Sequence, residues 1–297
     1  MKSPKIGILG VGWVGEQLKR YFEELKGYEA GNDLLLYDIK PEKCAGDFNN
    51  ADLIFVTLPT PRNSDGSCDL SILRETLANI KGEKIIVIRS TVPPGATESF
   101  QKQYPRHKFL FNPEFLTESR AWEDMLRPDR QIVGFTEKSL EAAYLVLNLL
   151  PKAPFMSPWG MNTYQKIRIT AMEAELIKYA GNLHFVRKVN WANAVSQVAK
   201  KLGADYENVR QGMAADHRIG DSHLDVNHGG YRGWGGACFP KDLDAFIQFT
   251  KTNKIHQVAQ ILQADRDFNE NLLKEQGLSL EEVSQHIDVL KEKLKNK

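Results

Sequence analysis

The stretch Ile6-Gly7-Ile8-Leu9-Gly10-Val11-Gly12-Trp13-Val14-Gly15 decides the fold of this chain. An apolar run predicts a buried strand, and three glycines in the pattern Gly-X-Gly-X-X-Gly follow it directly. In such a motif Gly10 permits a tight turn, Gly12 lets the backbone approach a pyrophosphate, and Gly15 allows close packing between helix and strand. Because the motif follows a strand and opens a helix, it predicts a dinucleotide-binding turn.

Asp38 stands at the end of the second predicted strand, directly after the apolar run 34–37. A carboxylate at this place can bind both ribose hydroxyls of an adenosine and would repel the 2′-phosphate of NADP. The predicted cofactor is therefore NAD, although Lys40 and Lys43 lie close enough to soften that repulsion.

Short apolar runs alternate with amphipathic stretches through the first half of the chain. Runs that are apolar on both faces predict a parallel sheet covered by helices. They occupy residues 6–9, 34–37, 53–56, 85–88 and 109–111, with residues 131–135 as a further strand. A helix is expected over residues 69–80 with Asp69 as its N-cap, and another over about 137–150. The pattern predicts an α/β fold: an N-terminal Rossmann-type doubly wound NAD-binding domain over residues 1–157.

The second half is predicted to be helical. Thr170 and Glu173 form a capping-box pattern, only Gly181 interrupts the helical run 171–202, and Gly203 is placed to end it. This helix is apolar over so much of its circumference that it must be buried, within the domain or against a second subunit. We expect an all-helical central domain over 166–272, a homodimer formed through helix 171–202, and a C-terminal charged helix over 273–297.

Composition excludes several classes of function. The 297 residues are 42% hydrophobic and 26% charged, as in ordinary soluble proteins, and a net charge of +1 favours neither nucleic-acid nor membrane-surface partners. No membrane span or signal-peptide pattern is evident, and three sparse cysteines suit a reducing cytoplasm. No His or Cys cluster has the spacing of a metal site.

Cys238 stands in the segment Gly235-Gly236-Ala237-Cys238-Phe239-Pro240-Lys241-Asp242. Pro240 suits the first turn of a helix, so the thiol would lie just ahead of a helix start, with a cation three residues on. Such a setting favours the thiolate, which is the nucleophilic form. The alternative is that Cys238 is a small buried hydrophobe.

Three loops marked by proline follow sheet strands. They are residues 57–61, 90–95 and 112–116. All three lie at carboxyl ends of strands, where doubly wound folds bind ligands, and together they predict a shaped site.

At this point the sequence closely resembles the UDP-glucose/GDP-mannose dehydrogenase family, from the N-terminus to about Asn269. The matching segments are the Gly10–Gly15 turn, Thr60-Pro61, Ser90-Thr91-Val92-Pro93, residues 112–116, Pro128-Asp129-Arg130, residues 174–182, residues 216–220 and the Cys238 segment. The family oxidises the C6 hydroxyl of a nucleotide sugar to a carboxylate and reduces two NAD per substrate.

The resemblance implies roles for individual residues. Cys238 would capture the C6 aldehyde as a thiohemiacetal, which a second hydride transfer converts to a thioester. Lys178 and Asn182 are four residues apart on one helix face and would stabilise the oxyanion at C6. The remaining catalytic roles fall to Asp242 (positioning water and accepting protons), Glu114 (general base for thioester hydrolysis) and Thr91 (water-holding hydroxyl).

The resemblance also implies binding residues, and these fall into two sets. Cofactor-binding residues are expected at Gly10, Gly12, Val14, Gly15, Asp38, Lys43, Thr60, Thr91 and Glu118. Substrate-binding residues are expected at Phe115, Leu116, Lys178, Asn182, Arg218 and Gly235, with Arg218 reaching the sugar nucleotide across the dimer interface.

The chain departs from the family pattern in two respects. Members usually continue into a second doubly wound unit that grips the nucleotide, and here only about thirty residues follow the central region, so this UDP-binding domain is expected to be lacking. Residues 231–234 widen the glycine loop in a manner nearer the GDP-mannose branch. Two alternatives stay open: a catalytically silent NAD-binding or assembly protein, and a simpler hydroxyacid dehydrogenase, against which the intact Cys238 segment argues.

Overall fold

The computed structural model describes residues 4–158 and 167–284, which form two compact units. One unit comprises Met1–Pro61 with Asp69–Lys178, and the other comprises Arg62–Cys68 with Tyr179–Lys297. The boundary therefore falls inside a helix, between Lys178 and Tyr179. Residues 159–166, where the two predicted domains meet, and residues 285–297 of the predicted charged helix lie outside the described residues.

A sheet of six strands forms the centre of the first unit, in the order β2-β1-β3-β4-β5-β7. The first five strands of that order are parallel, and β7 is antiparallel to β5. The strands are β1 Ile6–Leu9, β2 Leu34–Tyr37, β3 Leu53–Val56, β4 Ile85–Ile88, β5 Lys108–Phe111 and β7 Gly134–Phe135. This order confirms the doubly wound fold that the apolar runs predicted.

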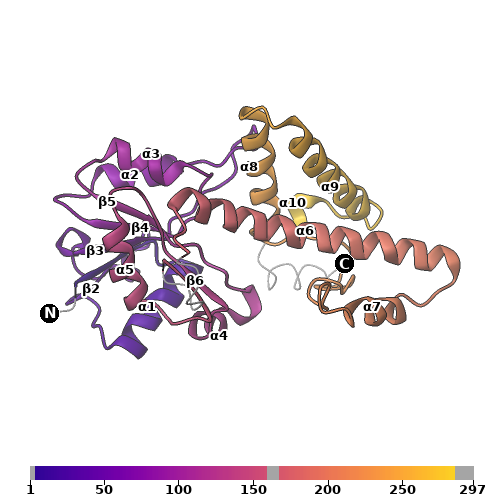
Figure 1. The fold of residues 1–297 in the computed structure, drawn as a ribbon, viewed down its shortest axis with the longest axis horizontal. Helices are drawn as coiled ribbons and strands as arrows, with labels where there is room; N and C mark the ends of the chain where they lie inside the picture. Colours follow the sequence, from indigo (N-terminus) through magenta and orange to yellow (C-terminus); the bar gives the residue numbers. More distant parts are fainter. Residues whose placement is uncertain (1–3, 159–166, 285–297) are drawn as a thin grey trace. The chain divides into compact units, whose positions relative to one another are not determined.

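Helices cover both faces of this sheet (Figure 1). On one face pack α1 Trp13–Lys26, α4 Ala121–Leu126 and α5 Leu140–Leu149. On the other pack α2 Ser71–Ala78, α3 Ala96–Gln103 and the first turn of α6 Ala171–Leu202. Short 3₁₀ turns are η1 Pro41–Lys43, η2 Phe48–Asn50 and η3 Glu118–Arg120.

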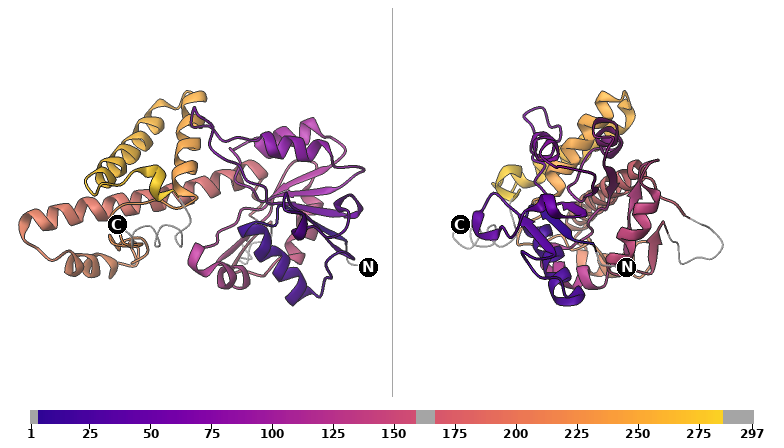
Figure 2. Two further views of the ribbon diagram at one scale, coloured as in Figure 1. Left: turned by 180° about the vertical axis from the view of Figure 1, so that it is seen from behind. Right: turned by 90° about the vertical axis from the view of Figure 1, so that its left-hand side faces the viewer.

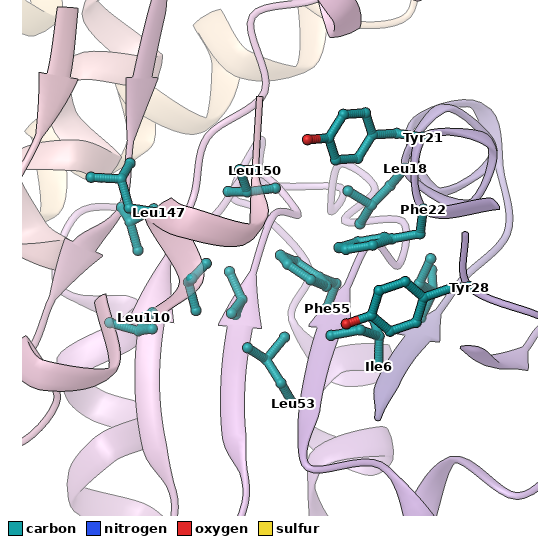
Figure 3. Close-up of a cluster of buried hydrophobic side chains, with 14 of the residues drawn as sticks. Ile6, Leu18, Tyr21, Phe22, Tyr28, Leu53, Phe55, Leu110, Leu147 and Leu150 are labelled. Carbon is teal, nitrogen blue, oxygen red and sulfur yellow. The ribbon is translucent and has the colours of Figure 1, made fainter. Parts of the chain in front are cut away.

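The core on the α1 face is aromatic at its centre. Phe22 on α1 lies edge-to-face with Tyr28 at 5.3 Å between ring centroids and tilts against Phe55 of β3 at 5.7 Å (Figure 3). Phe22 and Phe55 are fully buried. Such pairs add about 0.5–1.5 kcal/mol to the area that they bury, which fixes α1 firmly on the sheet.

The strand register places the first residue after each parallel strand in one row. Leu9 pairs with Tyr37 and with Val56, Val56 with Ile88, and Ile88 with Phe111. The next residues are therefore neighbours along the carboxyl edge, and they are Asp38, Gly10, Thr57, Arg89 and Asn112. The strand order reverses at β1, so Gly10 stands at the topological switch point, where doubly wound sheets bind ligands.

Three local predictions differ from the structure. Residues 131–135 do not form one strand: β6 Arg130–Ile132 pairs with β8 Phe155–Ser157 in a separate sheet, whereas β7 joins β5. The helix expected from residue 137 begins at Leu140. Asp69 is not the N-cap residue of α2, which is Leu70, yet its carboxylate accepts the Ser71 N–H at 2.8 Å and serves the same helix end.

Residues 179–284 of the second unit form helices and their connecting loops, as predicted. After α6 come α7 Tyr206–Ala214, α8 Phe239–Thr252, α9 His256–Lys274 and α10 Leu280–Val283. Helices α8 and α9 run side by side (Figures 1 and 2) and share a core with α6 built from Leu183, Val186, Val189, Trp234, Leu243, Ile247 and Leu262. None of the helices in residues 4–158 and 167–284 is long and apolar enough to cross a membrane.

Helix α6 has the ends that its sequence indicates, but it is only partly buried in the single chain. Thr170 and Glu173 form the predicted capping box, and Gly203 follows the last turn in the left-handed conformation, φ +73°. Some apolar side chains of α6 are buried, among them Tyr179 and Val186. Others are exposed in the single chain, namely Met172, Leu176, Trp191, Val198 and Leu202.

Candidate active site

The glycine turn has the geometry that a pyrophosphate requires. Gly10 adopts φ +92°, and a Cβ on Gly15 would lie 2.0 Å from the Gly10 carbonyl oxygen, so neither position tolerates a side chain. A Cβ on Gly12 would meet nothing within 4 Å, so this side of the turn is open. No side chain caps the N-terminus of α1, which begins at Trp13 with Val14 in its first turn. Uncapped N–H groups at a helix start bind anions.

Asp38 and Lys43 hold the same turn from the β2 side. The Val11 N–H donates to Asp38 Oδ2 at 2.7 Å, the Lys40 N–H donates to Asp38 Oδ1 at 3.0 Å, and Lys43 Nζ donates to the Val11 carbonyl at 2.5 Å. The structure thus brings a half-buried carboxylate beside the open glycine. These residues fit NAD: an open backbone and uncapped helix for the pyrophosphate, and a carboxylate for the ribose.

Two threonines join the loops along the carboxyl edge. Thr57 Oγ1 donates to the carbonyl of Gly10, and Thr60 Oγ1 donates to the carbonyl of Thr91 at 2.8 Å. Thr60 is buried, whereas Thr91 is partly accessible. The predicted residues Thr60 and Thr91 are therefore in direct contact, and Thr57 is a site residue that the sequence reading missed.

Glu114 and Lys178 form a buried ion pair. Lys178 Nζ lies 2.6 Å from Glu114 Oε1 and also donates to the Glu114 carbonyl at 2.9 Å, and both side chains are less than a tenth exposed. Burial works to raise the pKa of the Glu114 carboxyl, but the Lys178 ammonium, the Leu116 N–H and the nearby Arg89 guanidinium hold this pKa below its usual value. The two predicted residues are thus direct partners, and Glu114 is ionised at neutral pH.

Arg89 is a buried cation that the sequence reading overlooked. It is 5% exposed and donates through Nη1 to Asn112 Oδ1, while Asn112 Nδ2 donates to Gln131 Oε1 at 2.9 Å. Burial lowers the pKa of Arg89 to about 10, and the Glu114 carboxylate counteracts part of that effect. The signal was a charged residue placed directly after the apolar run 85–88.

Phe115, Leu116 and Glu118 follow Glu114 along one loop. The Phe115 ring lies under the Arg130 guanidinium at 3.8 Å and 6.0 Å from Lys178 Nζ. The Leu116 N–H donates to Glu114 Oε2 at 2.9 Å. Glu118 begins η3 and is half-buried.

In the second unit, Cys238 is the N-cap residue of α8, as predicted. Pro240 lies in the first turn, and the thiol-bearing residue is exposed, which contradicts the alternative of a buried hydrophobe. The Lys241 ammonium is electrostatically coupled to it: burial works to lower the pKa of Lys241, but Asp242, Cys238 and Cys68 raise it above its ordinary value. A helix start and a cation both favour a thiolate.

Asp242 links this thiol segment to α6. The Asn182 amide donates to Asp242 Oδ2 at 2.6 Å, Lys241 Nζ donates to Oδ1 at 2.5 Å, and Asp242 is 1% exposed. Each carboxylate oxygen therefore receives a donor, and Asn182 is held close to the start of α8.

The predicted residues Gly235 and Arg218 have different surroundings. A Cβ on Gly235 would lie 2.4 Å from the Val283 carbonyl oxygen, and the Gly236 N–H donates to that oxygen, so the glycine pair packs on α10. Arg218 is exposed and pairs with Asp216 at 2.6 Å.

Residues 62–68 belong to the second unit although they lie between β3 and α2 in sequence. Arg62 Nε donates to Asp244 Oδ2 at 2.5 Å, and Arg266 Nε lies 3.0 Å from Asp244 Oδ1. Asp244 is 6% exposed and stands in the second turn of α8. This segment therefore supports α8, the helix that Cys238 precedes.

A doubly wound dinucleotide-binding unit is thus joined to a helical unit that carries an exposed thiol at a helix start. Comparison with known proteins gives the family. The model of the UDP-glucose/GDP-mannose dehydrogenase family matches this chain with its NAD binding domain over residues 42–147 and with its central domain over residues 172–271. The chain belongs to this family.

Several relatives are identical to this chain at about a third of the aligned positions. The UDP-glucose 6-dehydrogenase of Rickettsia bellii is 34% identical over 73% of this chain and 49% of its own length. The UDP-glucose 6-dehydrogenase AglM of Haloferax volcanii is 30% identical over 90% of this chain and 69% of its own length. A solved UDP-glucose dehydrogenase from Pyrobaculum islandicum has a TM-score of 0.74 at 27% identity, over 93% of this chain and 71% of that one. The chain spans about half the length of the Rickettsia enzyme.

Proposed function

We propose that the chain is an NAD-dependent nucleotide-sugar 6-dehydrogenase that converts the C6 hydroxyl of UDP-glucose, or of a related UDP- or GDP-sugar, to a carboxylate. The observation that carries this proposal is the exposed Cys238 at the start of α8, beside Lys241 and joined to Asn182 through Asp242. The family match and the names of the relatives support the substrate class.

NAD, when bound, supplies the hydride acceptor for both oxidations. The Gly10–Gly15 turn with the α1 N-terminus would hold its pyrophosphate, and Asp38 would hold its ribose. Because the Asp38 carboxylate would repel a 2′-phosphate, NAD is preferred over NADP. The chain's own side chains then have to handle the aldehyde, the oxyanion and the protons.

Cys238 would keep the aldehyde from escaping between the two oxidations. Its thiolate adds to the C6 aldehyde to give the oxyanion of a thiohemiacetal, and loss of hydride from C6 converts this oxyanion to a thioester on sulfur. Lys178 and the Asn182 amide are donors suited to an oxyanion at C6, since Lys178 carries a third N–H beyond the two that Glu114 accepts. Asp242 holds Asn182 in place and can take up a proton.

Hydrolysis of the thioester would complete the reaction. Glu114, which Lys178 keeps ionised, accepts a proton from a water molecule that Thr91 holds. The water oxygen bonds to C6, the C–S bond breaks, and Cys238 returns to the thiolate. This scheme gives every one of the six predicted catalytic residues a task.

We further propose that two copies of the chain associate through α6. The support is the set of large apolar side chains that this helix exposes in the single chain, of which Trp191 is 61% exposed and Leu202 77% exposed. Light scattering should give a dimer mass, and Trp191→Glu should shift it toward the monomer. A wild-type monomer at micromolar concentration contradicts this part of the proposal.

The proposed activity is tested by incubating the protein with NAD and, in parallel, UDP-glucose and GDP-mannose while NADH absorbance is followed. We expect NADH and a sugar acid with one of these sugars, and no sugar acid with Cys238→Ser. Measurable NAD binding without NADH from any nucleotide sugar would favour the alternative of a silent NAD-binding or assembly protein.

A further inference from the structure

The proposed mechanism leaves one buried carboxylate unused. Glu175 on α6 is 0% exposed, and it forms no ion pair with any residue in the described ranges 4–158 and 167–284. Its oxygens instead accept the Gly95 N–H at 2.5 Å and the Thr97 N–H at 2.8 Å. A fully buried carboxylate without a cation needs such donors, and backbone N–H groups at a helix start provide them.

These two N–H groups open helix α3, which has no cap of its own. Its N-cap residue is Gly95, φ +92°, and no local side chain caps the helix. Helix starts are usually capped by a Ser, Thr, Asp or Asn at the N-cap itself. Here the cap comes from a residue 80 positions away in sequence, so it also fixes where α3 lies relative to α6.

The loop before α3 carries Thr91, the candidate water-holding residue. At one end of this loop, Ser90 Oγ donates to the Leu58 carbonyl at 2.6 Å, and the Thr91 carbonyl accepts from Thr60. At the other end, Glu175 holds the N–H of Gly95. The loop is thus fixed at both ends, and the second attachment depends on one side chain.

Helix α6 is a firm support for that attachment. A Cβ on Gly134 would lie 2.7 Å from both the Thr170 carbonyl oxygen and Ala174 Cβ, so α6 meets β7 without a side chain between them. Ala171 and Ala174 are fully buried. Three residues after Glu175, on the same helix, Lys178 holds Glu114.

We propose that Glu175 is a positioning residue for thioester hydrolysis: from one turn of α6 it fixes the Thr91 loop, while Lys178 fixes the Glu114 carboxylate. The inference rests on the proposed function and concerns its last step. The step needs a water molecule held between the Thr91 hydroxyl and the Glu114 carboxylate. Displacing either by about 1 Å slows such a step by up to 10²-fold.

The burial of Glu175 supports this assignment, because a buried carboxylate lowers the stability of the folded chain. Desolvation raises the pKa of Glu175 to about 7, with Glu98 on α3 adding to the rise and the N–H donors opposing it. Ionised Glu175 therefore destabilises the folded chain at alkaline pH, where a neutral glutamine would not. A residue kept at the expense of stability is typical of a functional position.

The test compares Glu175→Gln with wild type in the NADH assay at pH 8, using UDP-glucose or whichever nucleotide sugar the wild type oxidises. We expect kcat to fall about 10- to 100-fold because the Thr91 loop loses one attachment, and the KM for the sugar to fall with it, so that kcat/KM stays within about twofold. Both hydride transfers precede hydrolysis, so the variant should show a burst of NADH followed by a slow phase. Intact-mass spectrometry during turnover should show an acyl adduct that Cys238→Ser lacks.

Glu173→Gln is the matched control, since Glu173 also accepts two hydrogen bonds on α6, but at the exposed end of the helix. It should keep the wild-type kcat. Glu175→Asp keeps the charge on a shorter stem and should recover part of the rate, and it decides the question in the same assays if Glu175→Gln does not fold. An unchanged kcat, or a lower kcat without adduct, overturns the inference; a wild type that forms no NADH overturns the proposed function instead.

Discussion

Removing the Lys178 ammonium should destabilise the first unit strongly. Lys178→Met retains most of the side-chain volume but leaves Glu114 as a buried carboxylate that has lost its partner at 2.6 Å, and its side chain is only 8% exposed. Breaking a buried pair by removing one partner costs about 3–5 kcal/mol. In a chain of this size that loss corresponds to a fall of roughly 10 °C in the melting temperature.

The destabilisation by Lys178→Met should depend on pH in a definite direction. In the wild type the folded-state pKa of Glu114 is depressed, so the pair stabilises the fold above the unfolded value of 4.5 and loses that effect as pH falls through the folded pKa. In Lys178→Met the largest cause that lowers the pKa of Glu114 is lost; burial then faces only the Leu116 N–H and the Arg89 guanidinium, so this pKa rises. Protonation of Glu114 then removes the buried charge. The difference in free energy of unfolding between variant and wild type should therefore be smaller at pH 5 than at pH 8.

Melting curves of Lys178→Met, Glu114→Gln and the double variant at these two pH values measure the effect. The double variant should be more stable than the sum of the two single losses predicts, by about 1–3 kcal/mol, because neither buried group is then left charged and alone. A loss below about 1 kcal/mol for Lys178→Met at pH 8, or strict additivity, would refute the reasoning.

Three further outcomes follow from the same contacts. Gly15→Ala should prevent the turn from forming, since its Cβ would lie 2.0 Å from a carbonyl oxygen. Gly12→Ala should have the melting temperature of the wild type, yet calorimetry should show NAD binding that is weaker by about tenfold or more. Equal NAD affinity in Gly12→Ala contradicts the pyrophosphate assignment. Asp38→Asn should lower the ratio of NAD to NADP affinity, and an unchanged ratio argues against a ribose contact. Glu175 has a raised folded-state pKa, so its stabilising effect is complete below pH 4.5 and lost as pH rises through 7. Over that range the free energy of unfolding of Glu175→Gln should rise relative to that of the wild type by up to about 3 kcal/mol. A difference in unfolding free energy that does not change with pH contradicts the raised pKa of Glu175.

Most of the strands, the glycine turn and the helix ends could be predicted from the sequence, because local patterns determine them. Near-continuous apolar runs gave five of the sheet strands, and the glycine spacing gave a turn whose positions 10 and 15 exclude a side chain. The ends of α6 and the start of α8 followed from capping chemistry at Thr170 and from Pro240. Each of these features depends on residues within a few positions of one another.

Features that depend on distant partners could not be predicted. Lys178 and Glu114 were given separate roles because nothing local shows that residues 64 apart are ion-paired. Glu175 was read only as part of a helix, since its partners lie 80 positions earlier. Residues 131–135 read as one strand because a change of sheet at Val133 leaves no mark on apolar periodicity.

The ratio of NADH formed to sugar acid formed tests the central claim most directly. If Cys238 holds the aldehyde as a covalent adduct through both oxidations, the wild type should yield two NADH per sugar acid, with no aldehyde trapped by an added hydroxylamine, and Cys238→Ser should yield no acid. One NADH per sugar with free aldehyde in solution, or an undiminished yield of acid from Cys238→Ser, would contradict the account.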